Sequence, residues 1–277
     1  AMGKGSFGCA ALVLSYHASR SDLPVPLLMG VQDELARHEM HLAVSRLPDD
    51  ELTRSGFVPK VLRESMADGM IINYTHEIPG RMLELIRVQG APVVWVNTDL
   101  PVDCVRPDDF EGSRKLTERL LELGHRRILY TKFDASTHYS VRDRRLGYES
   151  AMKSAGLVPR SIDRFVVADE QPELLRSILS TRDRPTAVIA RPEDVPSFAI
   201  AATQLGLSVP DDLSLASISG RYLTLLGREV TIALVPAEDE GVEAVRMLIE
   251  KLESPGTPCE QRKVPFRIFS GATSVAP

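Results

Sequence analysis

The sequence predicts an α/β protein with two doubly wound parallel sheets. Short apolar runs rich in β-branched residues alternate with amphipathic stretches of helical period, which is typical of parallel strands covered by helices on both faces. The length of 277 residues is enough for two domains. The proline-bearing stretch Leu100–Pro107 separates a first series of units from a second that begins at Asp109. We therefore expect two sheets rather than one large sheet.

The apolar runs and the helical patterns between them give the order of elements. The expected strands are Phe7–Leu14, Leu42–Ser45, Gly69–Asn73, Val93–Asn97, Arg127–Thr131, Arg164–Val167, Ala187–Ala190 and Leu213–Ile218. Helical spacing of apolar residues is found at Leu27, Val31 and Leu35, at Met82, Leu85 and Ile86, at Leu116, Leu120 and Leu121, at Ile178 and Leu179, and at Ile200 and Leu205. A helix at about Asp239–Leu252 and a strand near Val264–Phe269 end the chain.

Carboxylates and glycines mark the ends of the expected helices. Asp108, Asp109 and Glu111 suit the start of a helix, because anions there complement unpaired backbone amides. Glycines suit the position just after a helix, and three are expected there: Gly124, Gly156 and Gly206. The pairs Asp49-Asp50 and Asp211-Asp212 are assigned to helix starts or turns for the same reason, rather than to acid–base chemistry.

Composition excludes several classes of protein. The net charge of −5 argues against direct binding to a phosphate backbone, which needs a clustered positive surface. No apolar run reaches the roughly 18 residues of a membrane helix. The three cysteines, Cys9, Cys104 and Cys259, are widely spaced and form no CxxC pair, so neither a disulfide framework nor a zinc site is expected. A reducing compartment fits this cysteine usage.

Short motifs that suggest chemistry are assigned to ordinary structure. His38 and His41 are one residue too close for the HExxH zinc motif, and they fall where the first helix should end. Gly3-Lys4-Gly5-Ser6 lacks the strand and the spacing of a phosphate loop, and residues 1–5 are expected to be a tail or a cloning remnant. Only eight residues precede Cys9, too few for a lipoprotein signal. We expect no catalytic residue, metal or cofactor.

A dense basic patch, Arg142-Asp143-Arg144-Arg145, stands at the start of an expected helix. It has two interpretations. The patch could be a solvated helix face, or one of its arginines could turn inward and bind ligand oxygens in a bidentate manner.

Six segments in the same order resemble the effector-binding core of the lactose/galactose-repressor family. They are Ala67–Ile72 (ADGMII), Ala91–Val94 (APVV), Leu123–Ile128 (LGHRRI), Arg142–Tyr148 with Ala151, Met152, Ala155 and Gly156 after it, Arg184–Val188 (RPTAV) and Gly206–Ser214 (GLSVPDDLS). The resemblance spans nearly the whole chain. It implies two lobes of the periplasmic-binding-protein-like type I fold, joined by three crossovers, with a small ligand in the cleft between the lobes.

The resemblance also implies boundaries between the lobes. Residues 6–107 and 236–262 would form the first lobe, and residues 108–235 and 263–277 the second, with crossovers near Pro107, Val235 and Lys263. The family's DNA-binding head, a helix-turn-helix with a hinge helix, is expected to precede Ser6. A winged-helix head occurs on the same core in related regulators, so the type of head stays open.

The ligand residues implied by the resemblance depart from the usual pattern. Arg142 stands at the family's effector-arginine position, and Thr75, Tyr16 and His17 align with first-lobe contacts. Asn97 and Ser219 stand where the family has cleft aspartates, and Pro192-Glu193 replaces an Asn-Asp pair. Glu193 is kept as a candidate, as are the two added arginines, Arg191 and Arg221. Because a buried unpaired arginine is costly, this pattern favours an anionic effector such as a sugar acid or sugar phosphate. Arginines that extend to solvent are the alternative.

The resemblance predicts the sensing core of a cytoplasmic transcriptional regulator, not an enzyme. We expect a homodimer, with the helix around Leu27–His38 and a helix from Leu62 near the interface, and operator DNA bound only through the head. A packed helix face within one subunit would give the same apolar stripe. Trp95 is expected in the sheet core rather than against the ligand. The alternative function is a periplasmic or surface sugar-binding protein of the same fold.

Overall fold

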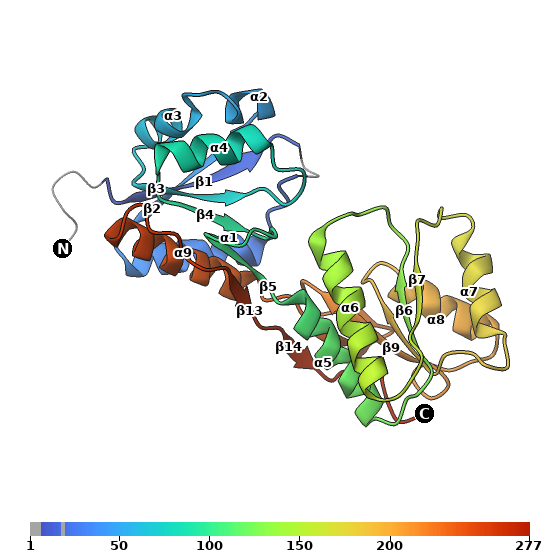
Figure 1. Ribbon diagram of the computed structural model, residues 1–277. Coiled ribbons are helices and arrows are strands. Elements are labelled where there is room, and N and C mark those ends of the chain that lie inside the picture. The colour runs from blue at the N-terminus through green and yellow to red at the C-terminus, as the bar shows by residue number, and fades with distance from the viewer. Residues whose placement is uncertain (1–6, 18–19) are drawn as a thin grey trace. The chain divides into compact units, whose positions relative to one another are not determined.

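The structure is a computed structural model that describes residues 7–17 and 20–277, and it divides into two compact units (Figure 1). The first unit holds the described chain up to Pro107 together with Pro236–Val264, and the second holds Asp108–Val235 and Pro265–Pro277. The expected tail of residues 1–5 and the Gly3–Ser6 run lie outside the described residues.

The first unit is built on a six-stranded sheet in which every neighbouring pair is parallel. The strands, in spatial order, are β13 (Arg262–Val264), β5 (Cys104–Pro107), β4 (Val93–Val96), β3 (Gly69–Asn73), β1 (Cys9–Ser15) and β2 (His41–Leu47). Parallel strands need crossovers between them, and helices supply these. They are α1 (Val25–Arg37), α2 (Asp49–Leu52), α3 (Phe57–Glu64), α4 (Gly80–Gln89) and α9 (Ala237–Glu253).

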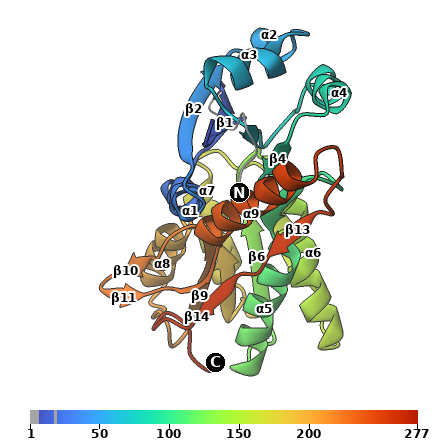
Figure 2. The same cartoon turned by 90° about the vertical axis from the view of Figure 1, so that its left-hand side faces the viewer.

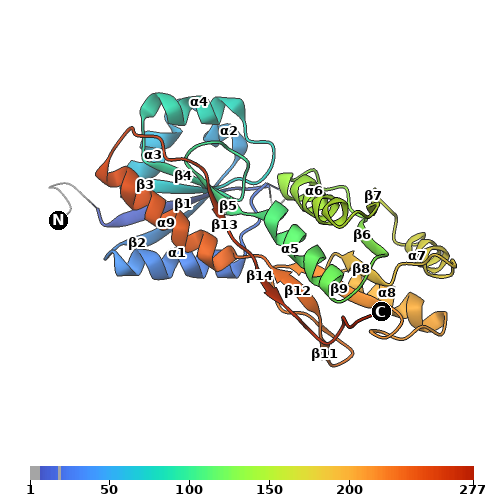
Figure 3. The same cartoon turned by 60° about the horizontal axis from the view of Figure 1, so that its bottom comes forward.

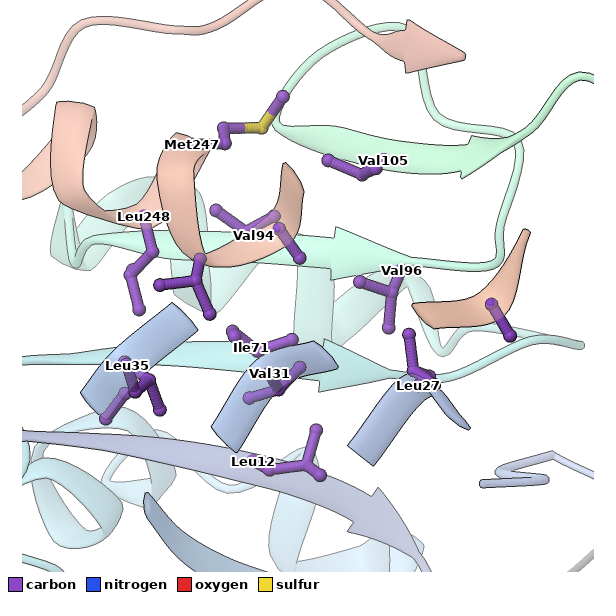
Figure 4. Packing of buried hydrophobic residues seen from close by; sticks show 14 of the residues in the cluster. Leu12, Leu27, Val31, Leu35, Ile71, Val94, Val96, Val105, Met247 and Leu248 are labelled. Carbon is purple, nitrogen blue, oxygen red and sulfur yellow. The ribbon is translucent and has the colours of Figure 1, made fainter. Parts of the chain in front are cut away.

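Alternate residues of the strands build two hydrophobic layers, one on each face of this sheet. On one face, Leu12, Ile71 and Val94 pack against α1 and α9, as Figure 4 shows. On the other face, Met70 and Trp95 pack with α3 and α4. Trp95 is 4% exposed, so its predicted place in the sheet core is confirmed.

The second unit repeats this architecture with one antiparallel edge strand. Its sheet has the order β14 (Arg267–Phe269), β12 (Thr231–Leu234), β9 (Ser214–Ser219), β8 (Ala187–Ala190), β6 (Ile128–Lys132) and β7 (Arg160–Asp163), and only β14 is antiparallel to its neighbour. One face packs against α5 (Asp109–Glu122) and α6 (Tyr139–Ser154), and the other against α7 (Gln171–Leu179) and α8 (Val195–Gln204). The short strands β10 (Thr224–Leu225) and β11 (Arg228–Glu229) form a small hairpin (Figure 2).

The prediction of two parallel sheets is confirmed, but it did not include β5 and β12, and three further details are wrong. The strand expected at Arg164–Val167 lies earlier, at Arg160–Asp163, where its partner is β6. The single strand expected near Val264–Phe269 is two strands, because the chain leaves one sheet after Val264 and enters the other at Arg267. Lys263 and Val264 pair with β5, so they belong to the first unit rather than the second.

The expected helix ends are confirmed. Asp108 caps α5, where its Oδ1 accepts a hydrogen bond of 3.3 Å from the amide of Glu111. The three glycines expected after helices all have positive φ: Gly124 (102°), Gly156 (71°) and Gly206 (73°). Asp49 and Asp50 lie in the first turn of α2, and Asp212 accepts hydrogen bonds from Ser208 in a turn. The expectation of a helix that begins at Leu62 is wrong. The helix there is α3, which begins at Phe57 and ends at Glu64, so Leu62 lies in its last turn.

Helices α5 and α6 approach very closely, and a glycine makes this possible. A Cβ on Gly147 would lie only 2.1 Å from the carbonyl oxygen of Phe110. Beside this contact, Arg144 Nε donates a hydrogen bond of 2.6 Å to Oδ1 of the buried Asp109. Burial alone would lower the pKa of Arg144, but the charge of Asp109 outweighs it and the pKa is raised.

We predict that Gly147→Ala destabilises the second unit. The added methyl group must push α5 and α6 apart, and overpacking of this kind costs about 1–3 kcal/mol. Calorimetry should show a lower melting temperature for the transition of this unit. Gly220→Ala is the control, because a Cβ there meets no atom within 4 Å. Equal melting temperatures for the two variants would contradict the close approach.

Candidate functional site

In the first unit, polar side chains gather where β1, β2 and β3 end. Carboxyl ends of parallel strands meet at one edge of a sheet, and ligands of open α/β sheets bind there. The residues that meet at this edge are Ser15, Arg20, Asp49, Tyr74 and Glu77, which we name the Asp49 cluster.

The carboxylate of Asp49 is the centre of this cluster. It accepts hydrogen bonds from Ser15 Oγ (2.8 Å) and Tyr74 Oη (3.1 Å), and it forms an ion pair with Arg20. Arg20 also donates to Oε2 of Glu77 at 2.7 Å. Burial raises the pKa of Tyr74, so its hydroxyl stays protonated and donates. The cluster therefore offers both hydrogen-bond donors and acceptors, as a polyhydroxylated ligand requires.

Three of the four residues expected to form the first-lobe site lie at this edge. His17 Nε2 is 3.8 Å from Asp49 Oδ2, and Tyr16 is exposed beside Arg46. Thr75 is buried, and its hydroxyl lies 3.2 Å from the carbonyl of Arg20 and 2.8 Å from His76 Nδ1. Arg20 and Asp49 were not foreseen, because nothing in their local sequence marks a site.

The fourth expected residue, Asn97, is held in position by its backbone conformation and by hydrogen bonds of its backbone amide. Its φ of 53° is left-handed, a conformation that asparagine tolerates better than most residues. Its backbone N–H donates to Glu240 Oε1 at 2.7 Å and to the backbone carbonyl of Val105 at 3.1 Å. Glu240 is buried and comes from the first turn of α9, more than a hundred residues away. A carboxylate is thus present next to the position where the sequence appeared to lose one.

In the second unit, charged side chains gather at the carboxyl ends of β6, β7 and β8. Lys132 Nζ is 3.4 Å from Asp134 Oδ1 and 3.5 Å from Asp163 Oδ1, and it donates to the carbonyl of Ser136 at 2.9 Å. Arg191 and Asp194 complete this group. We name Lys132, Asp134, Asp163, Arg191 and Asp194 the Lys132 cluster.

Arg191 is not an unpaired cation, which corrects an assumption behind the anionic effector. Its guanidinium donates to Asp134 Oδ2 at 2.6 Å and to Asp194 Oδ2 at 2.9 Å. Gln171 Nε2 donates a hydrogen bond of 2.8 Å to Asp194 Oδ1. The three carboxylates of the Lys132 cluster outnumber its two cations by one, so the added arginine does not make this cluster positively charged.

The remaining second-lobe candidates occupy different environments. Ser219 Oγ donates to the carbonyl of Arg221 at 2.7 Å and accepts from its amide at 3.2 Å, which closes a tight turn after β9. The side chains of Glu193 and Arg221 are exposed. The structure therefore brings Arg191 into a charged cluster but gives Ser219 a turn-forming role.

The basic patch of α6 divides its arginines between two roles. The side chain of Arg142 is 55% exposed and bonds to Asp143 Oδ1 at 2.8 Å from both Nε and Nη2. Arg144 is the arginine that turns inward, and its partner is Asp109 of α5. Helical spacing cannot distinguish these two neighbours, since both follow from the same local sequence.

Two other expectations concern metal and membrane. In residues 7–17 and 20–277, no group of three histidine, cysteine or acidic side chains is placed to hold a metal ion. His38 caps α1 and His41 begins β2, as expected for residues at a helix end. Within the same residues, no helix is long and apolar enough to cross a membrane.

Comparison with known proteins gives the class of this chain. Residues 117–274 match the model of the periplasmic binding protein-like domain, and the chain belongs to that family. Curated relatives include the HTH-type transcriptional regulator GntR of Escherichia coli (strain K12), 26% identical over 237 residues that cover 80% of this chain and 70% of the relative. The arabinose metabolism transcriptional repressor of Geobacillus stearothermophilus is 26% identical over 244 residues, covering 82% and 66%.

A solved structure supports the same fold. The lac repressor dimer bound to operator and the anti-inducer ONPF superposes with a TM-score of 0.76, covering 99% of this chain and 96% of that chain at 17% identity. The relatives named above are transcriptional regulators, which agrees with the expectation of a ligand-sensing regulator.

We predict that Asp134→Asn reduces the dependence of the second unit's stability on pH in the acid range. Burial alone would raise the pKa of Asp134, but the amide of Ser136 and the charges of Arg191 and Lys132 outweigh it, so the pKa is lowered. A depressed pKa stabilises the fold above the unfolded-state value of about 3.9, and this contribution is lost as the pH falls further. Denaturant titrations should show the wild type more stable than the variant at pH 7, with the difference shrinking below pH of about 4.

Asp183→Asn, at an exposed carboxylate of the same unit, is the control for this measurement. A difference between wild type and Asp134→Asn that is the same at neutral and acid pH would refute the charged role of Asp134.

Proposed function

We propose that this chain is the effector-sensing and dimerising part of a transcriptional regulator of the lactose/galactose-repressor family, and not an enzyme. One observation carries the proposal: each unit collects polar and charged side chains at the carboxyl edge of a parallel sheet, where ligands of such sheets bind. The named relatives, which match about four-fifths of the chain, are regulators. Binding of operator DNA would belong to the part of those relatives that this acidic chain does not span.

The effector proposed for the two clusters is a sugar or sugar derivative. Arg20, Lys132 and Arg191 supply donors, and the carboxylates of Asp49, Asp134 and Asp163 supply acceptors, which together suit a ring with several hydroxyl groups. A relative concerned with arabinose metabolism agrees with this class. An acidic group on the ligand would be received by Arg142 and Arg221, since Arg191 is already balanced by carboxylates.

Regulation would follow from unequal binding. A ligand that makes more contacts in one arrangement of the two lobes than in another shifts the equilibrium toward the first arrangement. In a dimer, that shift changes the spacing of two DNA-binding heads. We place such a regulator in the cytoplasm, where its operator is.

We predict that Arg142→Ala loses the response to the effector while the fold is kept. The arginine is largely exposed, so its removal costs little stability, whereas losing a bidentate ligand contact costs on the order of 2–5 kcal/mol of binding. A thermal-shift panel of neutral sugars, sugar acids, sugar phosphates and nucleobases identifies the ligand, and the variant is then tested with it. Arg176→Ala, at a surface ion pair of α7, is the control.

In that panel, a sugar or sugar derivative should raise the melting temperature most, and if Arg142 and Arg221 receive an acidic group, this ligand is a sugar acid or phosphate whose effect is weakened by salt. A neutral sugar that is most effective and insensitive to salt would remove the acidic group from the proposal. No stabilisation by any member would contradict an effector of this class.

We also predict a homodimer that depends on the outer face of α1. Leu27 and Val31 of this helix are buried against α9, whereas Met29 is 51% exposed and would lie in or near the subunit interface. Sedimentation at micromolar concentration should give twice the chain mass of 30.5 kDa. Met29→Lys should weaken the dimer at least about tenfold, because it would place a charge in an apolar interface. Val88→Lys, at an apolar residue of α4 that is 66% exposed, is the control. A species of 30.5 kDa alone would refute the dimer.

A further inference from the structure

The first unit contains a cavity of about 350 Å³ that the proposed function does not use. Leu83 and Ile86 of α4 form one wall, and Val93 and Trp95 of β4 form another. The loop before β5 and the segment after α9 line two further sides, and the cavity is open to solvent at Arg87 and Gly90. This volume is within the range of small-molecule sites, and its lining is mostly apolar, as in such sites.

The cavity lies at the edge of the sheet opposite the Asp49 cluster. Its walls include Gly90 and Ala91, which precede β4, and Asp103, which precedes β5, so it is at the amino ends of these strands. The residues expected to bind the effector follow the carboxyl ends instead. Figure 3 shows α4 and α9 on opposite faces of this sheet, with the segment after α9 turning back toward β13. A ligand here would be a second ligand, not the effector.

Three charged residues line the cavity, and two of them neutralise each other. Lys251 is buried, and its Nζ donates to Asp103 Oδ1 at 2.6 Å. The amide of Cys259 donates to the same oxygen at 2.9 Å. Arg87 lies in the last turn of α4 and is exposed at the mouth of the cavity, and within residues 7–17 and 20–277 no ion pair joins it to a carboxylate. The charged groups of the cavity therefore leave one positive charge, on Arg87.

We propose that this cavity binds a small apolar carboxylate. The apolar body of the ligand packs against Ile86 and Trp95, and its carboxylate pairs with the guanidinium of Arg87. A planar guanidinium matches a carboxylate with two parallel hydrogen bonds, and such charge-assisted bonds are stronger than neutral ones. A neutral ligand would gain the apolar contacts but not this pairing.

The chain carries its own reporter for the test. Trp95 is the sole tryptophan of the sequence, and it lines the cavity. Cyclohexanecarboxylate is the probe, because it absorbs no light used to excite tryptophan, and cyclohexanecarboxamide is its neutral partner of the same shape. Titration of each into the wild-type chain, followed by tryptophan emission and by calorimetry, measures both affinities.

The carboxylate should bind saturably in the millimolar range expected for a ligand of this size, and at least about tenfold more tightly than the amide. Arg87→Gln should remove that tenfold preference and leave the weak binding of the amide unchanged. Arg81→Gln, at an exposed arginine of the same helix that pairs with Glu84, should change neither affinity.

Absence of binding in both emission and calorimetry would overturn the proposal. Equal affinity for the two probes, or a preference that persists in Arg87→Gln, would overturn it as well. Because these probes are not sugars and the variant lies outside both polar clusters, the outcome is independent of the effector experiments.

Discussion

Parallel pairing of strands decides where polar side chains can meet in both units. All neighbouring strands of the first sheet run in the same direction, and in the second only β14 is reversed. All strands of a sheet except β14 therefore end at the same edge. The loops that follow them lie outside the buried sheet, so polar side chains can stand there. Asp49 and Arg20 meet there although 29 residues separate them, and Lys132 meets Asp163 in the same way. Helices end at the amino edge of the first sheet, and the apolar cavity lined by Gly90, Ala91 and Asp103 lies at that edge.

Pairing of charges limits what the arginines can do. A charge removed from water needs a partner, so the second unit surrounds Arg191 with Asp134 and Asp194 and gives Arg144 the carboxylate of Asp109. Counting arginines in the sequence suggested a positively charged site, but these partners remove that excess. Exposed Arg142, bonded to its neighbour Asp143, is the arginine of the patch that can reorient toward a ligand at small cost.

Periodicity predicts most of the fold because burial on both faces leaves a strong signal. Gly69–Asn73 and Ala187–Ala190 are found as expected, since each is a continuous apolar run. Strand β7 was misplaced because its residues, Arg160–Asp163, alternate between partly buried and exposed at the sheet edge. In the site, Thr75 and His17 could be inferred from the resemblance, but Glu240 could not. The resemblance places residues 236–262 in the first lobe, but no local pattern indicates which side chain of α9 lies beside Asn97.

We propose that the Asp49 cluster and the Lys132 cluster both take part in binding the effector, each at the carboxyl edge of its own sheet. Hydrogen–deuterium exchange, with and without the ligand that most stabilises the chain, tests this claim most directly because it reports on each segment separately. We expect slower exchange on binding in segments 73–77 and 97–99 of the first unit and 132–138, 191–194 and 219–222 of the second. Protection confined to one unit, or protection at the amino edge around residues 90–93, would contradict it.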